Sequence, residues 1–354
     1  MARPKKTNFP QAALETTKVD WSQWDPWAGS QGLIGVAIPL ALGFFLNHPS
    51  YGAIAAGGAL YIGLGSYDKQ TRTSTSFMFL GSLIISLAAL TGSLCGKNIW
   101  EMTLLACVWA FAAGMLSTLA SPLSFIGIKT LVTLLIAGSY PSSWEDAFYR
   151  ASLILSGALL QTLLFYIENS YFSGFGAPRR LSTPKPAWKK SWNLLSTHLS
   201  FRSEVLQHAL RLALCVAIAE PLSRMFLTHN AYWLPLTAVI VLKPDFEQTL
   251  VRGFARMAGT IVGVVLTTLI VIWLNPSGIA LALFTLPCAW LCFSLFRASY
   301  TLYSVCITAY IVFMLSFIGI PEMSVLTNRL IATFAGGTLA LILFALWPNR
   351  KANS

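Results

Sequence analysis

Charged residues are scarce in this sequence. Asp, Glu, Lys and Arg make up 10% of its 354 residues, against about 25% in soluble globular domains. This scarcity excludes an ordinary soluble fold, and the hydrophobic content of 55% and mean hydropathy of +0.64 point to a bilayer. Apolar runs that approach the ~20 residues needed to span a hydrocarbon core recur along nearly the whole chain. We therefore expect an all-α polytopic membrane protein.

Histidine is scarcer still, and the motifs of catalysis are missing. The chain has 4 His and lacks HExxH, GxSxG and phosphate-loop patterns. We therefore expect neither an enzyme nor a cofactor. The 6 cysteines all fall in apolar segments, where free cysteine behaves as a small buried hydrophobe. Cys288 and Cys292 lie four apart without a His or acidic neighbour, so we expect no metal site.

Acidic residues are few, which leaves a net charge of +11. In a membrane protein this excess does not indicate nucleic acid, because basic residues mark cytoplasmic loops. If the N-terminus is cytoplasmic, 18 of the 24 Lys and Arg fall in inside segments and only Lys97 and Arg224 in outside loops. We therefore expect both termini to be cytoplasmic, in the inner or plasma membrane. We expect no signal peptide, because the first 30 residues are polar.

The apolar runs form two sets of six. An N-terminal arm, 1–30, precedes a first six-helix repeat at 31–167. A basic linker follows at 168–205, and a second six-helix repeat at 206–347 precedes the tail at 348–354. The expected spans are 31–46, 51–65, 77–95, 102–119, 122–139 and 147–167, then 206–227, 231–242, 257–274, 277–296, 299–319 and 325–347.

The two sets resemble each other in sequence. The segment 39–51 is similar to 221–232, with Pro-Leu, then Phe-Leu, then a His three residues before a Tyr. The segment 149–165 matches 328–344, which pairs Arg150 with Arg329. Because each set has an even number of spans, the copies run parallel, and a pseudo-two-fold axis along the membrane normal should relate them.

The second span of each set is unusual. Residues 51–65 carry five glycines, and residues 231–242 contain Pro235 and end at Lys243-Pro244. Twelve helical residues reach ~18 Å, short of the ~30 Å core. Paired interrupted spans of this kind indicate a transporter's binding site. Lys243 is therefore expected to bind substrate, and Asp245 to bind substrate or carry protons.

Arg252 and Arg256 follow the interrupted span and share one helical face. Two arginines on one face can attract an anion. The alternative is that they decorate a solvated loop and enforce topology.

The stretch AYWLPLTAVIVLKPDFEQTLVRGFARMAGTIVGVVL (231–266) resembles the signature of the fusaric acid resistance and aromatic acid exporter family. Its matching positions are Tyr232-Trp233, Pro235-Leu236-Thr237, Pro244-Asp245-Phe246, Thr249, Arg252, Arg256, Gly259-Thr260 and Gly263. The first half matches loosely, and of the arginine pair only Arg72 remains there. The linker is too short for the soluble domain of larger members.

The resemblance implies proton-driven export of aromatic or other weak organic acids. A passive organic-anion channel and a non-transporting scaffold for envelope assembly are the alternatives. The expected partners are the lipid bilayer and a small organic anion, and a homo-oligomer stays open. The site residues expected in the motif are Tyr232, Trp233, Lys243, Arg252 and Arg256.

Rare charges inside other spans add candidates. Lys129 lies well inside the fifth span, where a lysine costs roughly 2.5–3.5 kcal/mol on insertion scales, so it is expected to bind substrate or to snorkel. Glu220 is a candidate proton carrier or a partner of Arg224. Arg150 and Arg329, like Arg72, are expected to gate the pathway or to anchor helix ends.

Overall fold

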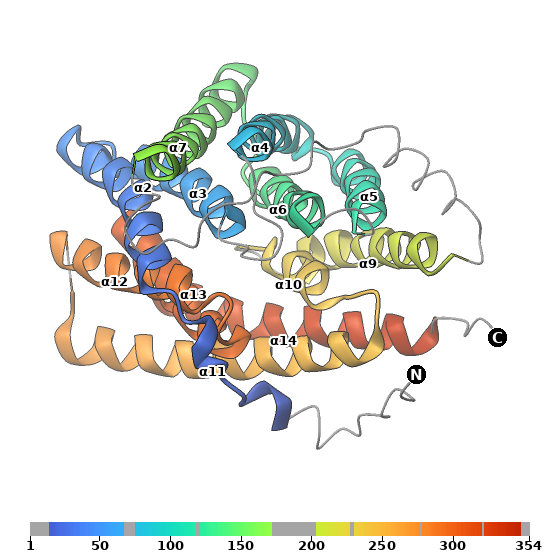
Figure 1. Ribbon diagram of the computed structural model, residues 1–354. Coiled ribbons are helices and arrows are strands. Elements are labelled where there is room, and N and C mark those ends of the chain that lie inside the picture. The colour runs from blue at the N-terminus through green and yellow to red at the C-terminus, as the bar shows by residue number, and fades with distance from the viewer. Residues whose placement is uncertain are drawn as a thin grey trace.

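Helices account for the regular structure of the chain (Figure 1). The computed structural model describes residues 14–66, 75–117, 121–171, 203–226, 230–276, 278–320 and 322–347. In these ranges lie a short 3-10 helix and twelve α-helices, with no strand. Their bounds are η1 Trp21–Gln23, α2 Pro26–Phe45, α3 Pro49–Ser66, α4 Thr75–Cys95, α5 Ile99–Leu116, α6 Ser121–Gly138, α7 Trp144–Tyr171, α9 Glu204–Phe226, α10 Trp233–Val241, α11 Phe246–Leu274, α12 Ile279–Leu295, α13 Tyr300–Phe317 and α14 Glu322–Leu346.

Polar side chains begin several of these helices. Asp25 caps α2 by accepting a hydrogen bond from the backbone N–H of Ala28, and Pro26 occupies its first turn. Asn98 caps α5 and Ser299 caps α13 in the same way. Such caps satisfy backbone donors that a helix cannot pair internally, so each apolar run starts at a defined residue.

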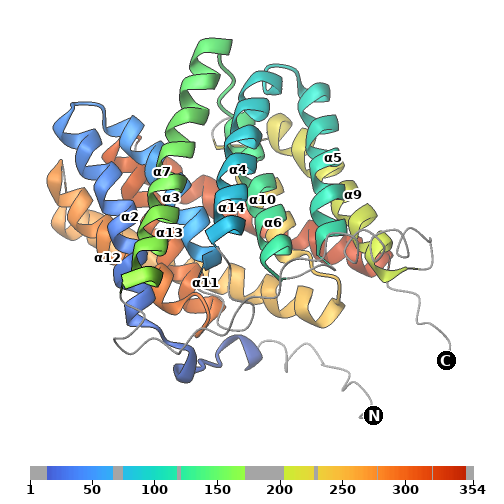
Figure 2. The same cartoon turned by 45° about the horizontal axis from the view of Figure 1, so that its top comes forward.

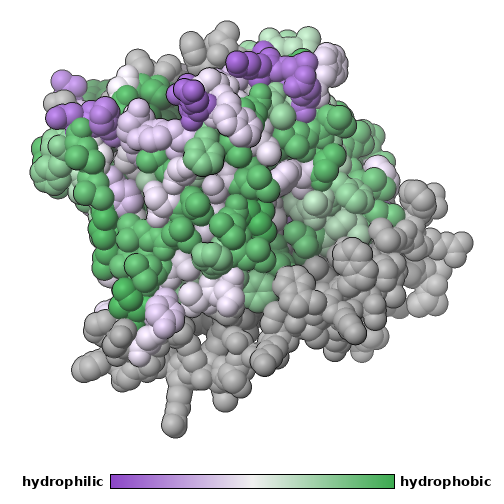
Figure 3. All heavy atoms as spheres, turned by 90° about the horizontal axis from the view of Figure 1, so that it is seen from above, coloured by the Kyte–Doolittle hydropathy of each residue, from purple (hydrophilic) through white to green (hydrophobic). Residues whose placement is uncertain are grey.

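The protein is an integral membrane protein. Among the described residues, eight helices are long and apolar enough to cross a bilayer, and two shorter apolar helices lie at Leu123–Gly138 and Ile279–Leu295. Hydrophobic side chains cover most of the coloured face in Figure 3, and hydrophilic ones gather along one edge. The all-helical membrane fold expected from composition is thus confirmed, whereas the count of twelve spans stays a prediction.

The same pairs of helices pack in both halves of the chain. In the first half α3 packs on α2 and α7, and α4 packs on α6 and α7. In the second half α10 packs on α9 and α14, and α11 packs on α13 and α14. The halves meet where α5 packs on α9 and α2 packs on α12, at opposite sides of the molecule (Figure 1 and Figure 2).

Glycines bring corresponding helices close together. A Cβ atom at Gly157 of α7 would collide with the carbonyl oxygen of Ala55 in α3. At the corresponding place in the second half, a Cβ atom at Gly336 of α14 would collide with the carbonyl oxygen of Leu234 in α10. Small residues at such crossings let membrane helices approach closely, because dispersion replaces the hydrophobic effect there.

The break expected after residue 242 is present. Helix α10 has nine residues, and α11 starts afresh at Phe246 after the extended residue Leu242. The expected span 257–274 therefore forms the later part of a 29-residue helix that also carries Arg252 and Arg256. Trp21, Trp24 and Trp27 are three residues apart in the sequence but do not share one helix. Trp21 lies in η1 and Trp27 in α2, with Trp24 between them, and all three are exposed.

Candidate functional site

A cavity of about 670 Å³ lies between the two halves of the chain. Helices α3, α6 and α7 line it from the first half, and α10, α11, α13 and α14 line it from the second. Its volume is typical of sites that hold small molecules. Helices α3 and α10, the two unusual second spans, thus face the same space.

The cavity follows two helices along most of their length. On α6 its lining runs from Ser124 to Ala137 and continues to Tyr140 in the next loop. On α13 it runs from Tyr300 to Leu315, and Ile318 and Ile320 extend it. The 13 helical steps from Ser124 to Ala137 correspond to ~20 Å at helical rise, about two thirds of the ~30 Å hydrocarbon core. A cavity of this length suits passage across a bilayer better than binding at one face.

Six basic side chains line the cavity, and no Asp or Glu is among its described lining residues. They come from five different elements, so no single helix accounts for the charge. These residues are Lys129 of α6, Arg150 of α7, Lys243 of the α10–α11 break, Arg252 and Arg256 of α11 and Arg329 of α14. Lys129, Lys243, Arg252 and Arg256 were expected to bind substrate, and Arg150 and Arg329 to gate the pathway or to anchor helix ends. The fold brings all six to one cavity.

Three of these cations are buried and have no acidic partner among the residues that the structure describes. Lys129 is 8% exposed, Arg256 is 4% exposed and Arg329 is 1% exposed. Arg329 donates one hydrogen bond, from Nε to the Thr308 hydroxyl at 3.3 Å, while its Nη2 atom and the Nε atom of Arg256 have none. A buried charge left uncompensated is costly, so unpaired cations around a cavity indicate an anionic ligand.

Aromatic rings take the place of carboxylates beside the cations. The Nζ atom of Lys129 lies 5.2 Å from the ring centroids of both Tyr61 and Phe125. The guanidinium of Arg252 lies 4.1 Å from the ring of Tyr300, and that of Arg329 lies 5.4 Å from the ring of Trp233. Cation–π contacts stabilise a charge without neutralising it. The cations therefore keep their capacity to bind an anion.

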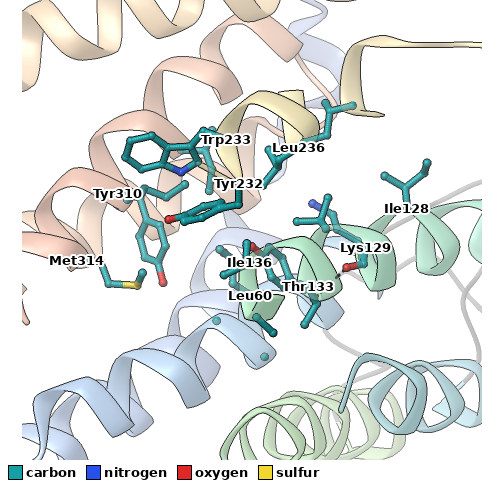
Figure 4. Close-up of a pocket in the computed structure, with 18 of the residues that line it drawn as sticks. Leu60, Ile128, Lys129, Thr133, Ile136, Tyr232, Trp233, Leu236, Tyr310 and Met314 are labelled. Atoms are coloured by element: carbon teal, nitrogen blue, oxygen red, sulfur yellow. Dashed lines mark hydrogen bonds between the residues drawn. The ribbon is translucent and has the colours of Figure 1, made fainter. Parts of the chain in front are cut away.

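Nine aromatic side chains line the cavity in all. Figure 4 shows Lys129 on α6 facing Tyr232, Trp233 and Tyr310 across the space. Tyr232 and Trp233 were expected at the site. The others were missed, although Tyr300, Tyr303 and Tyr310 recur on one face of α13, and their helical spacing was the available signal. The nine are Tyr61, Phe125, Tyr140, Tyr232, Trp233, Phe296, Tyr300, Tyr303 and Tyr310.

The break between α10 and α11 is held by Thr249. Its hydroxyl accepts a hydrogen bond from the backbone N–H of Lys243 at 3.0 Å and donates to the carbonyl of Asp245 at 2.8 Å. The break lies outside both helices and directs Lys243 to the cavity. Burial, with the positive charges of Arg252 and Lys129, lowers the pKa of Lys243 to about 7. The charge of this wall therefore depends on pH near neutrality.

Polar contacts surround Tyr140, where the cavity lining on α6 continues into the next loop. The Tyr140 hydroxyl donates to the side-chain oxygen of Asn230 at 3.0 Å, and the rings of Tyr140 and Tyr232 lie 6.0 Å apart. Arg150 donates to the carbonyl of Tyr140 and, at 2.7 Å, to the hydroxyl of Ser93. Arg150 thus ties down the loop that carries Tyr140, while Arg329 is buried beside Trp233.

The two carboxylates expected to carry protons lie elsewhere. Asp245 is exposed and caps α11, accepting a hydrogen bond from the N–H of Gln248 at 3.1 Å. Glu220 is buried in an ion pair with Arg224, Nε to Oε1 at 2.8 Å. Arg224 also donates to the carbonyls of Gly96 and Gly138, which joins α9 to the ends of α4 and α6.

Cys288 and Cys292 do not line the cavity. Cys288 and Cys292 are both free, and the described residues hold no group of three or more His, Cys, Asp or Glu that suits a metal. Arg72 lies outside the described residues.

The comparisons with known proteins concern mainly the second half. Residues 208–343 match the family model of the fusaric acid resistance protein-like proteins. Uncharacterized protein ORF2 of Neisseria gonorrhoeae is 29% identical over 166 residues, 47% of this chain and 40% of the relative. An uncharacterized protein of Haemophilus influenzae is 30% identical over 160 residues, 45% of this chain and 22% of the relative.

A third relative has a location in its name. Inner membrane protein YccS of Escherichia coli is 31% identical over 86 residues, 24% of this chain and 12% of the relative. The chain thus spans two fifths or less of the length of these relatives. No solved structure matches it significantly. Residues 208–343, which include the broken helix pair α10 and α11, are thus similar to the fusaric acid resistance protein-like family.

Proposed function

We propose that this chain is a membrane transporter that exports weak organic acids as anions through the cavity between its halves. The observation that carries the proposal is the lining: six basic side chains, three of them buried, and no carboxylate among the described lining residues. Guanidinium and ammonium groups bind carboxylates by charge-assisted hydrogen bonds. Such a lining attracts anions and repels cations.

Aromatic acids are the substrates we propose first. Nine aromatic side chains share the cavity with the cations, and aromatic rings favour offset or edge-to-face contacts with one another. The carboxylate of an aromatic acid would bind Lys129, Arg256 or Arg329, and its ring would pack on the tyrosines. The similarity of residues 208–343 to the family is a second support, because that resemblance implies this substrate class.

We also propose that the two halves are parallel repeats with twelve spans in all. The packing of the same helix pairs in each half supports this arrangement, as does the glycine contact that α3 shares with α7 and α10 with α14. Helices α3 and α10 would then be the paired interrupted elements that line the pathway. The distribution of Lys and Arg supports cytoplasmic termini, and the name of YccS supports an inner-membrane location.

A passive anion channel is the second candidate. The absence of a carboxylate among the described lining residues favours it, because proton-driven transport commonly uses titratable side chains along the pathway. A scaffold would need neither the cations nor the cavity, so it is the weakest candidate.

An efflux assay tests the proposal. Cells with and without the chain are loaded with radiolabelled benzoate, and the label that remains is followed over time. We expect faster loss of benzoate from cells that contain the chain, and slower loss when Lys129 and Arg329 are both replaced by Gln. Equal loss from all three strains, with the chain present in the membrane, would refute anion export.

A further inference from the structure

Gly57 on α3 is open where the other glycines of that helix are packed. A Cβ atom added at Gly57 would meet nothing within 4 Å. At the other four glycines of α3, an added Cβ would meet a neighbouring backbone or side chain within 3 Å. Gly57 also lines the cavity and is partly exposed to it. Its missing side chain therefore leaves free space in the cavity.

Packing gives no reason for a glycine at this position. Ala55 and Gly58, its near neighbours on α3, face α7 at the close crossing with Gly157 and Ile154. Gly57 does not share that contact. Glycine in a helix interior is less favourable than alanine, because it loses more backbone freedom on folding. Because no neighbouring residue requires a glycine at position 57, the open space that this glycine leaves in the cavity explains it better.

The second half has a leucine at the corresponding place. Ala55 meets Gly157 two residues before Gly57, and Leu234 meets Gly336 two residues before Leu236. Leu236 lines the same cavity and is 7% exposed. The corresponding helices thus present no side chain at Gly57 and a leucine side chain at Leu236.

We propose that Gly57 and Leu236 together set the largest anion that the cavity admits. The inference rests on the proposed function and adds its size limit. A leucine side chain at position 57 would occupy the free space beside α3 and reduce the 670 Å³ of the cavity. It should therefore hinder a two-ring anion more than a one-carbon anion.

Flux measurements on the full chain in proteoliposomes test the size limit. The probes are methanesulfonate, benzenesulfonate and 2-naphthalenesulfonate, which are anionic at all relevant pH values and differ mainly in size. The variants are Gly57→Leu, Gly57→Ala and Leu236→Ala. Gly253→Ala is the matched control, because Gly253 is a helix glycine outside the cavity lining whose added Cβ would make only ordinary contacts of 3.5 Å or more.

We expect Gly57→Leu to lower the 2-naphthalenesulfonate flux at least about tenfold relative to methanesulfonate, as steric exclusion from a shaped pocket does. Gly57→Ala should slightly lower the ratio of the 2-naphthalenesulfonate flux to the methanesulfonate flux. Leu236→Ala should raise that ratio, and Gly253→Ala should leave it unchanged. If Gly57→Leu does not fold, the rise in Leu236→Ala decides the question. Equal loss of all probes, or a constant ratio across the variants, would overturn the size limit alone. Absence of flux in the wild-type chain would instead overturn the proposed function.

Discussion

Replacing Arg256 by Gln should weaken anion binding and leave the fold at least as stable. Arg256 is 4% exposed, lines the cavity and has no partner for its Nε atom. It also lies close enough to Lys129 and Arg329 to repel their charges. A positive charge buried without a counter-ion costs stability until an anion arrives. Binding and stability should therefore respond to the substitution in opposite directions.

The expected loss of affinity follows from the strength of one ionic hydrogen bond. A hydrogen bond to a charged group contributes about 1.5–3 kcal/mol, which corresponds to a rise in Kd of roughly 10- to 150-fold. Calorimetric titration of benzoate into the detergent-solubilised chain measures Kd. A thermal melt of the ligand-free chain, followed by intrinsic fluorescence, measures Tm. We expect the Tm of Arg256→Gln to be unchanged or raised.

Arg211 provides a matched control in the same half of the chain. It is 1% exposed but does not line the cavity. Its guanidinium lies 4.0 Å from the ring of Phe344 and donates to the carbonyl of Trp347. Arg211→Gln should therefore lower Tm and leave Kd for benzoate unchanged. If Arg256→Gln instead lowers Tm with an unchanged Kd, then Arg256 is a structural residue and the electrostatic reasoning is refuted.

Three further predictions follow from single contacts. Benzoate affinity should fall as the pH rises through about 7, where Lys243 loses its charge. Binding titrations of Lys243→Gln should lack that pH dependence. The same pH profile in wild type and variant would contradict the role of Lys243 in anion binding. Asp245→Ala should lower the free energy of unfolding by about 1 kcal/mol, because the helix cap is lost. Asp245→Asn keeps a capping oxygen and should retain the wild-type stability. Denaturant unfolding measures both variants, and an unchanged stability of Asp245→Ala would contradict the capping role. Single cysteines at both termini and in 168–205 should be labelled from the inside, and those in 97–101 and 321–324 from the outside; a linker labelled from outside would overturn the even number of spans.

The helices were largely predictable because the bilayer imposes a length on each apolar run. Within a few residues the runs at 77–95 and 299–319 correspond to α4 and α13. The break after residue 242 was predictable because Pro244 cannot continue the ladder of α10. The start of α11 at Phe246 was not predictable. Glu247 and Arg252 are charged residues typical of a loop, and only the folded structure shows that Arg252 lines a cavity.

The basic half of the site was predictable, and the aromatic half was not. A lysine inside an apolar run is rare, so Lys129 was conspicuous, whereas a tyrosine such as Tyr310 is ordinary there. Rarity alone also misleads. Arg211, like Arg329, is a charged residue inside an apolar run, but it contacts the ring of Phe344 and does not line the cavity. Which face of a helix meets the cavity depends on contacts between distant segments, and one sequence does not disclose them.

The position of the carboxylates bears on the driving force. Neither Asp245 nor Glu220 reaches the cavity, because the first caps α11 and the second is paired with Arg224. An anion that leaves a cell with a negative interior gains about 2.3 kcal/mol per charge for each 100 mV. We therefore expect a potassium diffusion potential, imposed with valinomycin and without a pH gradient, to drive benzenesulfonate out of proteoliposomes whose lumen is negative. Asp245→Asn keeps the helix cap and should leave this flux unchanged. Export that follows a pH gradient at zero potential, and that Asp245→Asn abolishes, would show instead that Asp245 carries the coupled proton.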